Sequence, residues 1–161
     1  MLWSSTATSD RGPGTPPQAR VSAGPSSAPQ PGSRRALVVE DAEDARELYV
    51  SELEEAGFSV AQAATGEAAL EQSRQFCPHV IVLDLMLPGV NGFSVARAVR
   101  AAATGRSVAI LAVTALTSGT LRRMAFEAGC DAFLCKPVVA ARIVEEAQRL
   151  LKTRRQGGGD A

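Results

Sequence analysis

Side chains that can bind a cation or a phosphoryl group follow four short apolar runs of the sequence. Glu40 and Asp41 follow the first of these runs, and Asp84 follows a later one. Thr114 and Lys136 follow two further runs. If the four runs are parallel strands, their carboxyl ends meet at one edge of a sheet. Three acids, a hydroxyl and an amine would then converge on one crevice.

Three carboxylates within a few ångströms repel one another, and a fold tolerates them where a cation neutralises their charge. Oxygen ligands with open positions suit Mg2+, which prefers octahedral geometry and retains waters. A carboxylate beside Mg2+ is also a possible phosphoryl acceptor, because phosphoryl transfer needs mainly positioning and charge neutralisation. Lys136 supplies a mobile positive charge for a phosphoryl oxygen, and Thr114 supplies a small hydroxyl donor.

From Arg35 onward, short apolar runs alternate with longer segments in which apolar residues recur at helical spacing. The predicted strands are residues 36–40, 58–62, 80–84, 108–113 and 132–135. Residues 80–83 and 108–113 are apolar at every position, which is typical of central parallel strands covered on both faces.

The segments between these runs are predicted to be five amphipathic helices. The apolar stripe of the first contains Ala45, Leu48, Tyr49, Leu53 and Ala56. The expected amino-terminal caps of the next three are Thr65, Asn91 and Thr117, and Gly57 and Gly129 are expected to end the first and fourth helices. Five strands alternating with five helices predict an α/β fold, a flavodoxin-like doubly wound parallel sheet in the order 2-1-3-4-5.

The two ends of the chain differ in composition from the middle. Residues 1–33 contain 20 Pro, Gly, Ser and Thr residues and almost no large aliphatic side chains, so they cannot bury enough surface to offset their ordering entropy. We therefore expect a disordered tail over residues 1–33, one domain over residues 34–152 and a short flexible tail over residues 153–161.

Composition sets further bounds. A length of 161 residues fits one domain, and a formal net charge of zero shows no nucleic-acid footprint or polybasic membrane patch. No apolar stretch is long enough to cross a membrane or to form a signal core, so a cytoplasmic protein is expected. Cys77, Cys130 and Cys135 form no Cys-x-x-Cys pair, and we expect them to be small core residues.

Residues 35 to 152 resemble the receiver domain of bacterial response regulators, in particular the single-domain regulators of the chemotaxis type. The run VVEDAED resembles the acidic pair of that family, DLMLPGVNG its phosphoacceptor loop, VTA its switch segment and CKP its lysine segment. Spacings of 43, 30 and 22 residues separate Asp41, Asp84, Thr114 and Lys136 in turn, and they fit the family's usual spacing. Each motif is short, but the four occur in order at strand ends.

The resemblance implies a Mg2+ site and a phosphoacceptor. Asp84 would be phosphorylated and would also ligate the metal ion. Asp41 would ligate Mg2+ directly, Glu40 would hold it largely through water, and the backbone carbonyl of Met86 would be a further ligand.

The resemblance also implies a switch. Thr114 and Lys136 would contact the phosphoryl group and turn inward. Phe133 stands at the position of an aromatic switch residue that is commonly Tyr in the family, so the phenolic hydroxyl is missing here. The bond before Pro137 is usually cis in the family.

A stand-alone receiver domain phosphorylated by a histidine kinase or a histidine phosphotransfer protein is the function that the resemblance implies. Such a chain is a phosphoacceptor with self-catalysed transfer and not a conventional enzyme. Only about ten residues follow the last predicted helix, too few for an output domain. We therefore expect output through phosphorylation-dependent protein binding or a relay, to an unnamed protein target, with no direct contact to nucleic acid or membrane.

Two alternatives use parts of the same pattern. A phosphohydrolase of the haloacid dehalogenase type also uses Asp, Thr or Ser, Lys and Mg2+. It places its nucleophile on the first strand and a second Asp two residues later, whereas Asp84 follows the third predicted strand and that position is Met86. A phosphorylation-independent receiver-like scaffold is disfavoured by the intact set of acids, Thr114 and Lys136.

The lifetime of an aspartyl phosphate depends on a water in line with the breaking bond. The side chains best placed to orient or exclude that water follow Asp84 and Thr114 by two residues, and here they are Met86 and Leu116. Neither can accept a strong hydrogen bond, and both can crowd the approach. The sequence therefore predicts slow self-dephosphorylation.

Deleting residues 1–33 should leave the fold and phosphorylation intact, because their composition contributes no core. Thermal melts and labelling of the truncated chain test this. A fall in Tm of more than about 5 °C, on the order of 1 kcal/mol, would show instead that the tail packs on the domain.

Overall fold

The computed structural model describes residues 29–102, 105–115 and 117–157. Residues 1–28 of the expected tail, and Leu116, lie outside the described residues. The strands are β1 (Arg34–Val39), β2 (Phe58–Ala63), β3 (Val80–Leu83), β4 (Ala109–Thr114) and β5 (Ala132–Cys135). The helices are α1 (Glu43–Glu55), α2 (Gly66–Phe76), α3 (Gly92–Ala101), α4 (Gly119–Ala128) and α5 (Ala140–Gly157), and a short 3-10 helix spans Gly105–Ser107.

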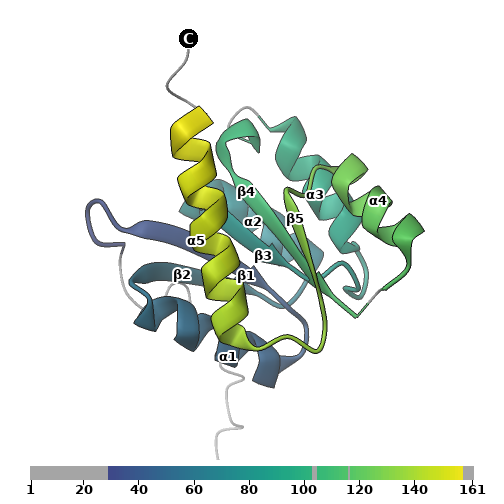
Figure 1. The fold of residues 1–161 in the computed structure, drawn as a ribbon, viewed down its shortest axis with the longest axis horizontal. Helices are drawn as coiled ribbons and strands as arrows, with labels where there is room; N and C mark the ends of the chain where they lie inside the picture. The colour runs from purple at the N-terminus through teal and green to yellow at the C-terminus, as the bar shows by residue number, and fades with distance from the viewer. Residues whose placement is uncertain (1–28, 103–104, 116, 158–161) are drawn as a thin grey trace, which may run out of the picture.

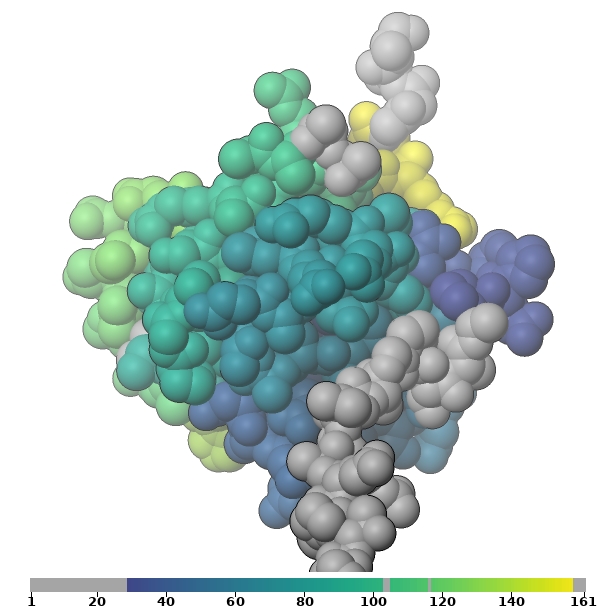
Figure 2. All heavy atoms as spheres, turned by 180° about the vertical axis from the view of Figure 1, so that it is seen from behind, coloured from purple at the N-terminus to yellow at the C-terminus, as the bar shows by residue number. Residues whose placement is uncertain are grey.

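The five strands form one parallel sheet in the order β2-β1-β3-β4-β5. The predicted fold class and strand order are confirmed. Helices α1 and α5 cover one face of the sheet, while α2, α3 and α4 cover the other (Figure 1). Figure 2 shows the molecule from the α2 and α3 side, where these helices hide the strands. The sheet is therefore the middle layer of three.

The core is divided between the two faces of the sheet because successive strand side chains point to opposite sides. Leu37, Ile81 and Ile110 face α2, α3 and α4, whereas Val38 and Val82 face α1 and α5. The central strands β3 and β4 are buried along their whole length. This explains why residues 80–83 and 108–113 are apolar at every position.

Most predicted helix ends are confirmed. Thr65 accepts a hydrogen bond from the backbone of Ala68, Asn91 caps α3 in the same way, and Gly57 and Gly129 have positive φ after α1 and α4. The expected cap Thr117 is wrong, because Ser118 accepts the backbone hydrogen bond of Leu121.

Two further expectations need correction. Leu48, expected in the buried stripe of α1, is 51% exposed. Cys130 is buried as expected, but Cys77 and Cys135 are exposed, and all three are free thiols. Among the described helices, none is both long and apolar enough to cross a membrane.

Helix α5 continues five residues past the expected domain end at residue 152 and reaches Gly157. Its last turns are held by Arg154, which donates to the carbonyl of Arg106 at 2.6 Å and to Asp131 Oδ1 at 2.6 Å. Asp131 also accepts hydrogen bonds from Arg100 and from the backbone of Ile110, both at 2.7 Å. The expected boundary at residue 152 is therefore too early, because these tertiary contacts hold residues 153–157 in the helix.

Gly92→Ala should lower the free energy of unfolding by about 1–3 kcal/mol, measured by urea denaturation. A Cβ atom at Gly92 would lie 2.4 Å from the carbonyl oxygen of Asp84 and 2.5 Å from the Cα of Leu85. Both are backbone atoms, so the end of β3 itself would have to shift.

Gly119 is the matched control. It also opens a helix directly after a capping side chain, but nothing lies within 4 Å of its added Cβ. Gly119→Ala should leave stability unchanged or raise it by up to about 1 kcal/mol. Equal destabilisation by both substitutions would contradict the packing argument.

Candidate functional site

The strand ends bring the predicted residues to one edge of the sheet. Glu40 continues β1, and its backbone N–H donates to Ala63 at 3.1 Å. Asp84 continues β3, and its N–H donates to the carbonyl of Val39 at 2.9 Å. Since these bonds extend the sheet ladder, both carboxylates are positioned by the sheet and not by loops alone.

Lys136 links the two buried acids. Its Nζ lies 2.5 Å from Glu40 Oε2 and 3.0 Å from Asp84 Oδ2. The backbone of Lys136 is fixed by a 2.9 Å hydrogen bond from its N–H to the carbonyl of Thr114, and the Lys136–Pro137 bond is cis. Three strand ends far apart in the sequence therefore meet through one ammonium group.

Glu40, Asp41 and Asp84 form a carboxylate cluster. One oxygen from each lies within 4.8 Å of the others. Glu40 and Asp84 are 2% and 6% exposed, whereas Asp41 is exposed to solvent. Such an oxygen-only set with one solvent-facing member fits a hydrated divalent cation of the Mg2+ type.

The second oxygen of each buried acid accepts a backbone hydrogen bond. Glu40 Oε1 accepts from Ala42 at 3.1 Å, and Asp84 Oδ1 accepts from Met86 at 2.9 Å. These bonds fix the carboxylate planes. The Met86 side chain is 57% exposed beside Asp84.

Burial and ion pairing act in opposite directions on the charged groups. Burial raises the pKa of Glu40 above its ordinary value, although the hydrogen bond from Lys136 opposes that shift. Burial alone would lower the pKa of Lys136, but its hydrogen bonds to Glu40 and Asp84 outweigh burial and raise that pKa. Lys136 is therefore held in its charged form between the two acids.

Thr114 and Phe133, the predicted switch residues, lie on the neighbouring strands β4 and β5. Thr114 is fully buried and pairs in register with Cys135. Phe133 is partly buried against the α2, α3 and α4 side of the core, and the Arg122 guanidinium lies 5.9 Å from its ring centroid. The Arg122 guanidinium also lies 6.0 Å from the centroid of the Phe126 ring, so it contacts two aromatic rings.

Arg46 is a positioning residue that sequence analysis missed. Its guanidinium donates to the carbonyl of Glu40 at 3.0 Å and to Gln62 Oε1 at 3.0 Å, so it joins the ends of β1 and β2. A cation near the amino end of a helix opposes the helix dipole. That unfavourable placement was the available signal that Arg46 has a specific partner.

The family model of the response regulator receiver domain matches residues 36–148. The transcriptional regulatory protein PrrA of Mycobacterium tuberculosis is 37% identical over 122 residues, which cover 76% of this chain and 52% of that protein. The response regulator PleD of Caulobacter vibrioides is 35% identical over 106 residues, covering 66% of this chain and 23% of PleD. The chain thus spans about half or less of the length of these curated relatives.

Solved structures agree with the fold. The chemotaxis response regulator CheY4 of Vibrio cholerae has a TM-score of 0.70 and 28% identity, covering 73% of this chain and 98% of that chain. The receiver domain of the sensor histidine kinase PA1611 of Pseudomonas aeruginosa has a TM-score of 0.69 and 29% identity. The match covers 74% of this chain and 98% of that chain. That structure has a magnesium ion coordinated in its active-site cleft.

The haloacid dehalogenase alternative gains no support from these comparisons. The family match covers most of the chain, and it includes every strand end that contributes to the carboxylate and lysine cluster. This chain belongs to the response regulator receiver domain family and carries the receiver domain of a two-component response regulator.

Proposed function

We propose that Asp84 accepts a phosphoryl group from a histidine kinase or a histidine phosphotransfer protein in a Mg2+-dependent reaction. The observation that carries this proposal is the contact of Lys136 Nζ with both Glu40 and Asp84 inside the carboxylate cluster. A buried acid at a strand end, fixed by backbone hydrogen bonds and adjoined by a cation, is suited to positioned phosphoryl transfer.

Glu40, Asp41 and Asp84 are the side chains that would hold Mg2+, with the backbone carbonyl of Met86 as a further ligand. Bound Mg2+ would supply positive charge that reduces repulsion between Asp84 and the incoming phosphoryl group. The magnesium ion in the PA1611 receiver domain supports this assignment by similarity.

In the proposed transfer, one carboxylate oxygen of Asp84 attacks phosphorus. An oxygen–phosphorus bond forms, the donor's bond to phosphorus breaks, and the donor keeps that electron pair. Lys136 would move from its present contact with Asp84 to a phosphoryl oxygen, since one ammonium can form several hydrogen bonds. Thr114 would donate its hydroxyl to another phosphoryl oxygen.

The phosphoryl group would change the surface through β4 and β5. It adds about −1.5 to −2 charge and three acceptor oxygens, which draw Thr114 and Lys136 inward. Phe133 would follow into the vacated space. Because Arg122 lies over both Phe133 and Phe126, movement of the Phe133 ring would also change the guanidinium contact on the surface of α4.

We further propose that the changed surface acts by binding a protein or by relaying the phosphoryl group. The curated relatives named as transcriptional regulators are longer than the matched region, and one relative is named as DNA-binding. DNA binding belongs by name to that one relative. For this chain, output by protein contact is supported by the location of Phe133 and Arg122 at the surface of α4 and β5.

Asp84→Asn should abolish labelling by acetyl phosphate, because the amide cannot act as the nucleophile. The label should be stable in acid, labile to base and hydroxylamine, and dependent on Mg2+. Asp41→Ala should severely weaken Mg2+ binding. The measurements are incorporation of radioactive phosphate and a Mg2+ titration of the wild-type chain and each variant.

Asp44→Asn is the matched control, since Asp44 is an exposed acid in the first turn of α1 and lies outside the cluster. It should label like the wild-type chain. Full labelling of Asp84→Asn would contradict the assignment. If a correctly folded wild-type chain cannot be labelled with Mg2+ present, the phosphorylation-independent scaffold would be favoured.

Met86→Asn combined with Leu116→Glu should speed the loss of phosphate by about tenfold or more, which corresponds to roughly 1.4 kcal/mol of barrier. Polar groups at these positions can orient a water, whereas the present side chains are apolar. The measurement is the first-order decay of label in excess Mg2+ after the donor is removed. Met86→Leu with Leu116→Met should decay like the parent, and a parental rate in the polar variant would refute this account of the lifetime.

A further inference from the structure

Five basic side chains line a pocket at the end of the sheet opposite to Asp84. The pocket has a volume of about 350 Å3 and is lined by Arg34, Arg35, His79, Arg154 and Arg155 among its polar residues. They come from the start of β1, from the residue before β3 and from the last turns of α5. None of the described residues that line it carries a carboxylate.

Ion pairs within the described residues neutralise only part of this positive charge. Arg154 pairs with Asp131 at 2.6 Å, but within the described part of the chain no ion pair reaches Arg34, Arg35 or Arg155. Crowded cations of this kind repel one another, and a bound anion would relieve that repulsion. The side chains of this pocket are basic, whereas those of the carboxylate cluster at the other edge of the sheet are acidic.

The walls of the pocket are fixed by hydrogen bonds. Arg35 Nε donates to the carbonyl of Cys77 at 2.9 Å, and the backbone N–H of Arg35 donates to His79 Nδ1 at 2.9 Å. Arg154 is held by Asp131 and by the carbonyl of Arg106. Side chains ordered before binding lose less entropy when a ligand arrives.

The neutral ring of His79 can donate a hydrogen bond from Nε2. Because Nδ1 accepts the hydrogen bond from Arg35, the proton of the neutral ring lies on Nε2. Desolvation of the ring, together with the guanidinium groups of Arg35 and Arg155, lowers the pKa of His79 below its ordinary value. The pocket therefore offers guanidinium donors and one imidazole donor.

We propose that this pocket binds a compact phosphate-rich anion with a diphosphate group, either as inorganic pyrophosphate or as part of a nucleoside diphosphate. Guanidinium groups pair with phosphate through two parallel hydrogen bonds, and a pocket of this size lies within the range of small-molecule sites. Leu151 supplies an apolar part of the wall. The site is a ligand-binding function beyond phosphorylation of Asp84.

The two sites are well separated. His79 precedes β3 and Asp84 follows it, so five residues at about 3.3 Å each place them about 16 Å apart. A ligand in the arginine-lined pocket therefore touches α5 and the starts of the strands without contacting the carboxylate cluster. This separation allows the two sites to be tested independently.

His79 is the one histidine of the chain, so its ring Cε1–H NMR signal reports on the pocket without assignment of other residues. The full chain is titrated with sodium pyrophosphate in EDTA, without phosphate or sulfate, against sodium chloride at matched ionic strength. We expect a saturable shift with pyrophosphate and none with chloride. Asp84→Asn should bind equally well, because EDTA and the substitution remove any contribution from the phosphoacceptor site.

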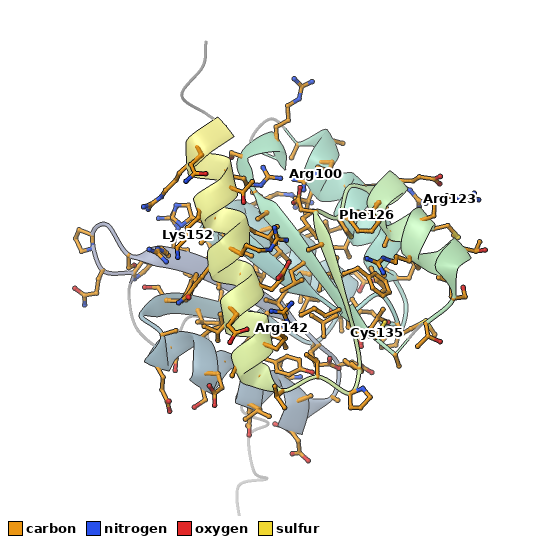
Figure 3. The ribbon with its side chains drawn as sticks, viewed as in Figure 1. Arg100, Arg123, Phe126, Cys135, Arg142 and Lys152 are labelled. Carbon is orange, nitrogen blue, oxygen red and sulfur yellow. The ribbon has the colours of Figure 1, made fainter. Side chains whose placement is uncertain are left out.

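Arg34→Gln with Arg155→Gln should weaken pyrophosphate binding by about tenfold or more, since two charge-assisted contacts are lost. Arg97→Gln with Arg123→Gln removes the same charge from exposed positions on α3 and α4 and should stay within about twofold of wild type. Figure 3 shows Arg123 on α4, on the side of the molecule away from the start of β1. If substitution at Arg34 impairs folding, Arg155→Gln alone should still weaken binding about threefold, because Arg155 is exposed near the end of α5.

ADP distinguishes the two sources of the diphosphate group. Tighter binding of ADP than of pyrophosphate would identify a nucleoside diphosphate, and weaker or equal binding would identify the diphosphate group alone, so both results support the site. A shift that does not saturate, equal weakening by both double variants, or a response to a DNA duplex but to neither small anion would overturn the proposal.

Discussion

Repulsion between like charges is the constraint that organises this molecule. Glu40 and Asp84 are almost fully buried, and Asp41 lies beside them. Buried carboxylates are costly unless paired, and the fold meets this cost by bringing Lys136 from the end of β5 to both buried acids. Without that ammonium or a divalent cation, the sequence could not keep three acids at one edge of its sheet.

The doubly wound sheet makes this arrangement possible because Glu40, Asp84 and Lys136 each continue a strand by a backbone hydrogen bond. The strands are covered by helices on both faces, so their ends cannot shift without disturbing the core. The same architecture forms a second edge, where the strands begin. Arginines line a pocket at that second edge, so the carboxylate cluster and the arginine-lined pocket lie at opposite ends of the strands.

The strand ends and the acid, hydroxyl and lysine set could be predicted because a buried parallel strand needs an uninterrupted apolar run, and a polar residue ends that run visibly. Details decided by tertiary contacts could not. Thr117 and Ser118 are equivalent capping candidates in sequence. The residue at which the backbone turns into α4 decides between them, and that residue is Ser118. The true end of α5 depends on Arg154 reaching Asp131, and the arginine-lined pocket is assembled from segments more than a hundred residues apart. Neither feature has a local pattern.

The pairing of Arg154 with Asp131 has a mechanical consequence. Asp131 directly precedes β5, and Arg154 belongs to the last turns of α5. At the other end, β5 and α5 are joined by the four residues that begin with Lys136. The strand and the helix are therefore joined at both ends, by the connecting residues at one end and by the Arg154–Asp131 ion pair at the other. A displacement of the Lys136 side chain would therefore act on both the strand and the helix, because the two elements are joined to each other at both ends.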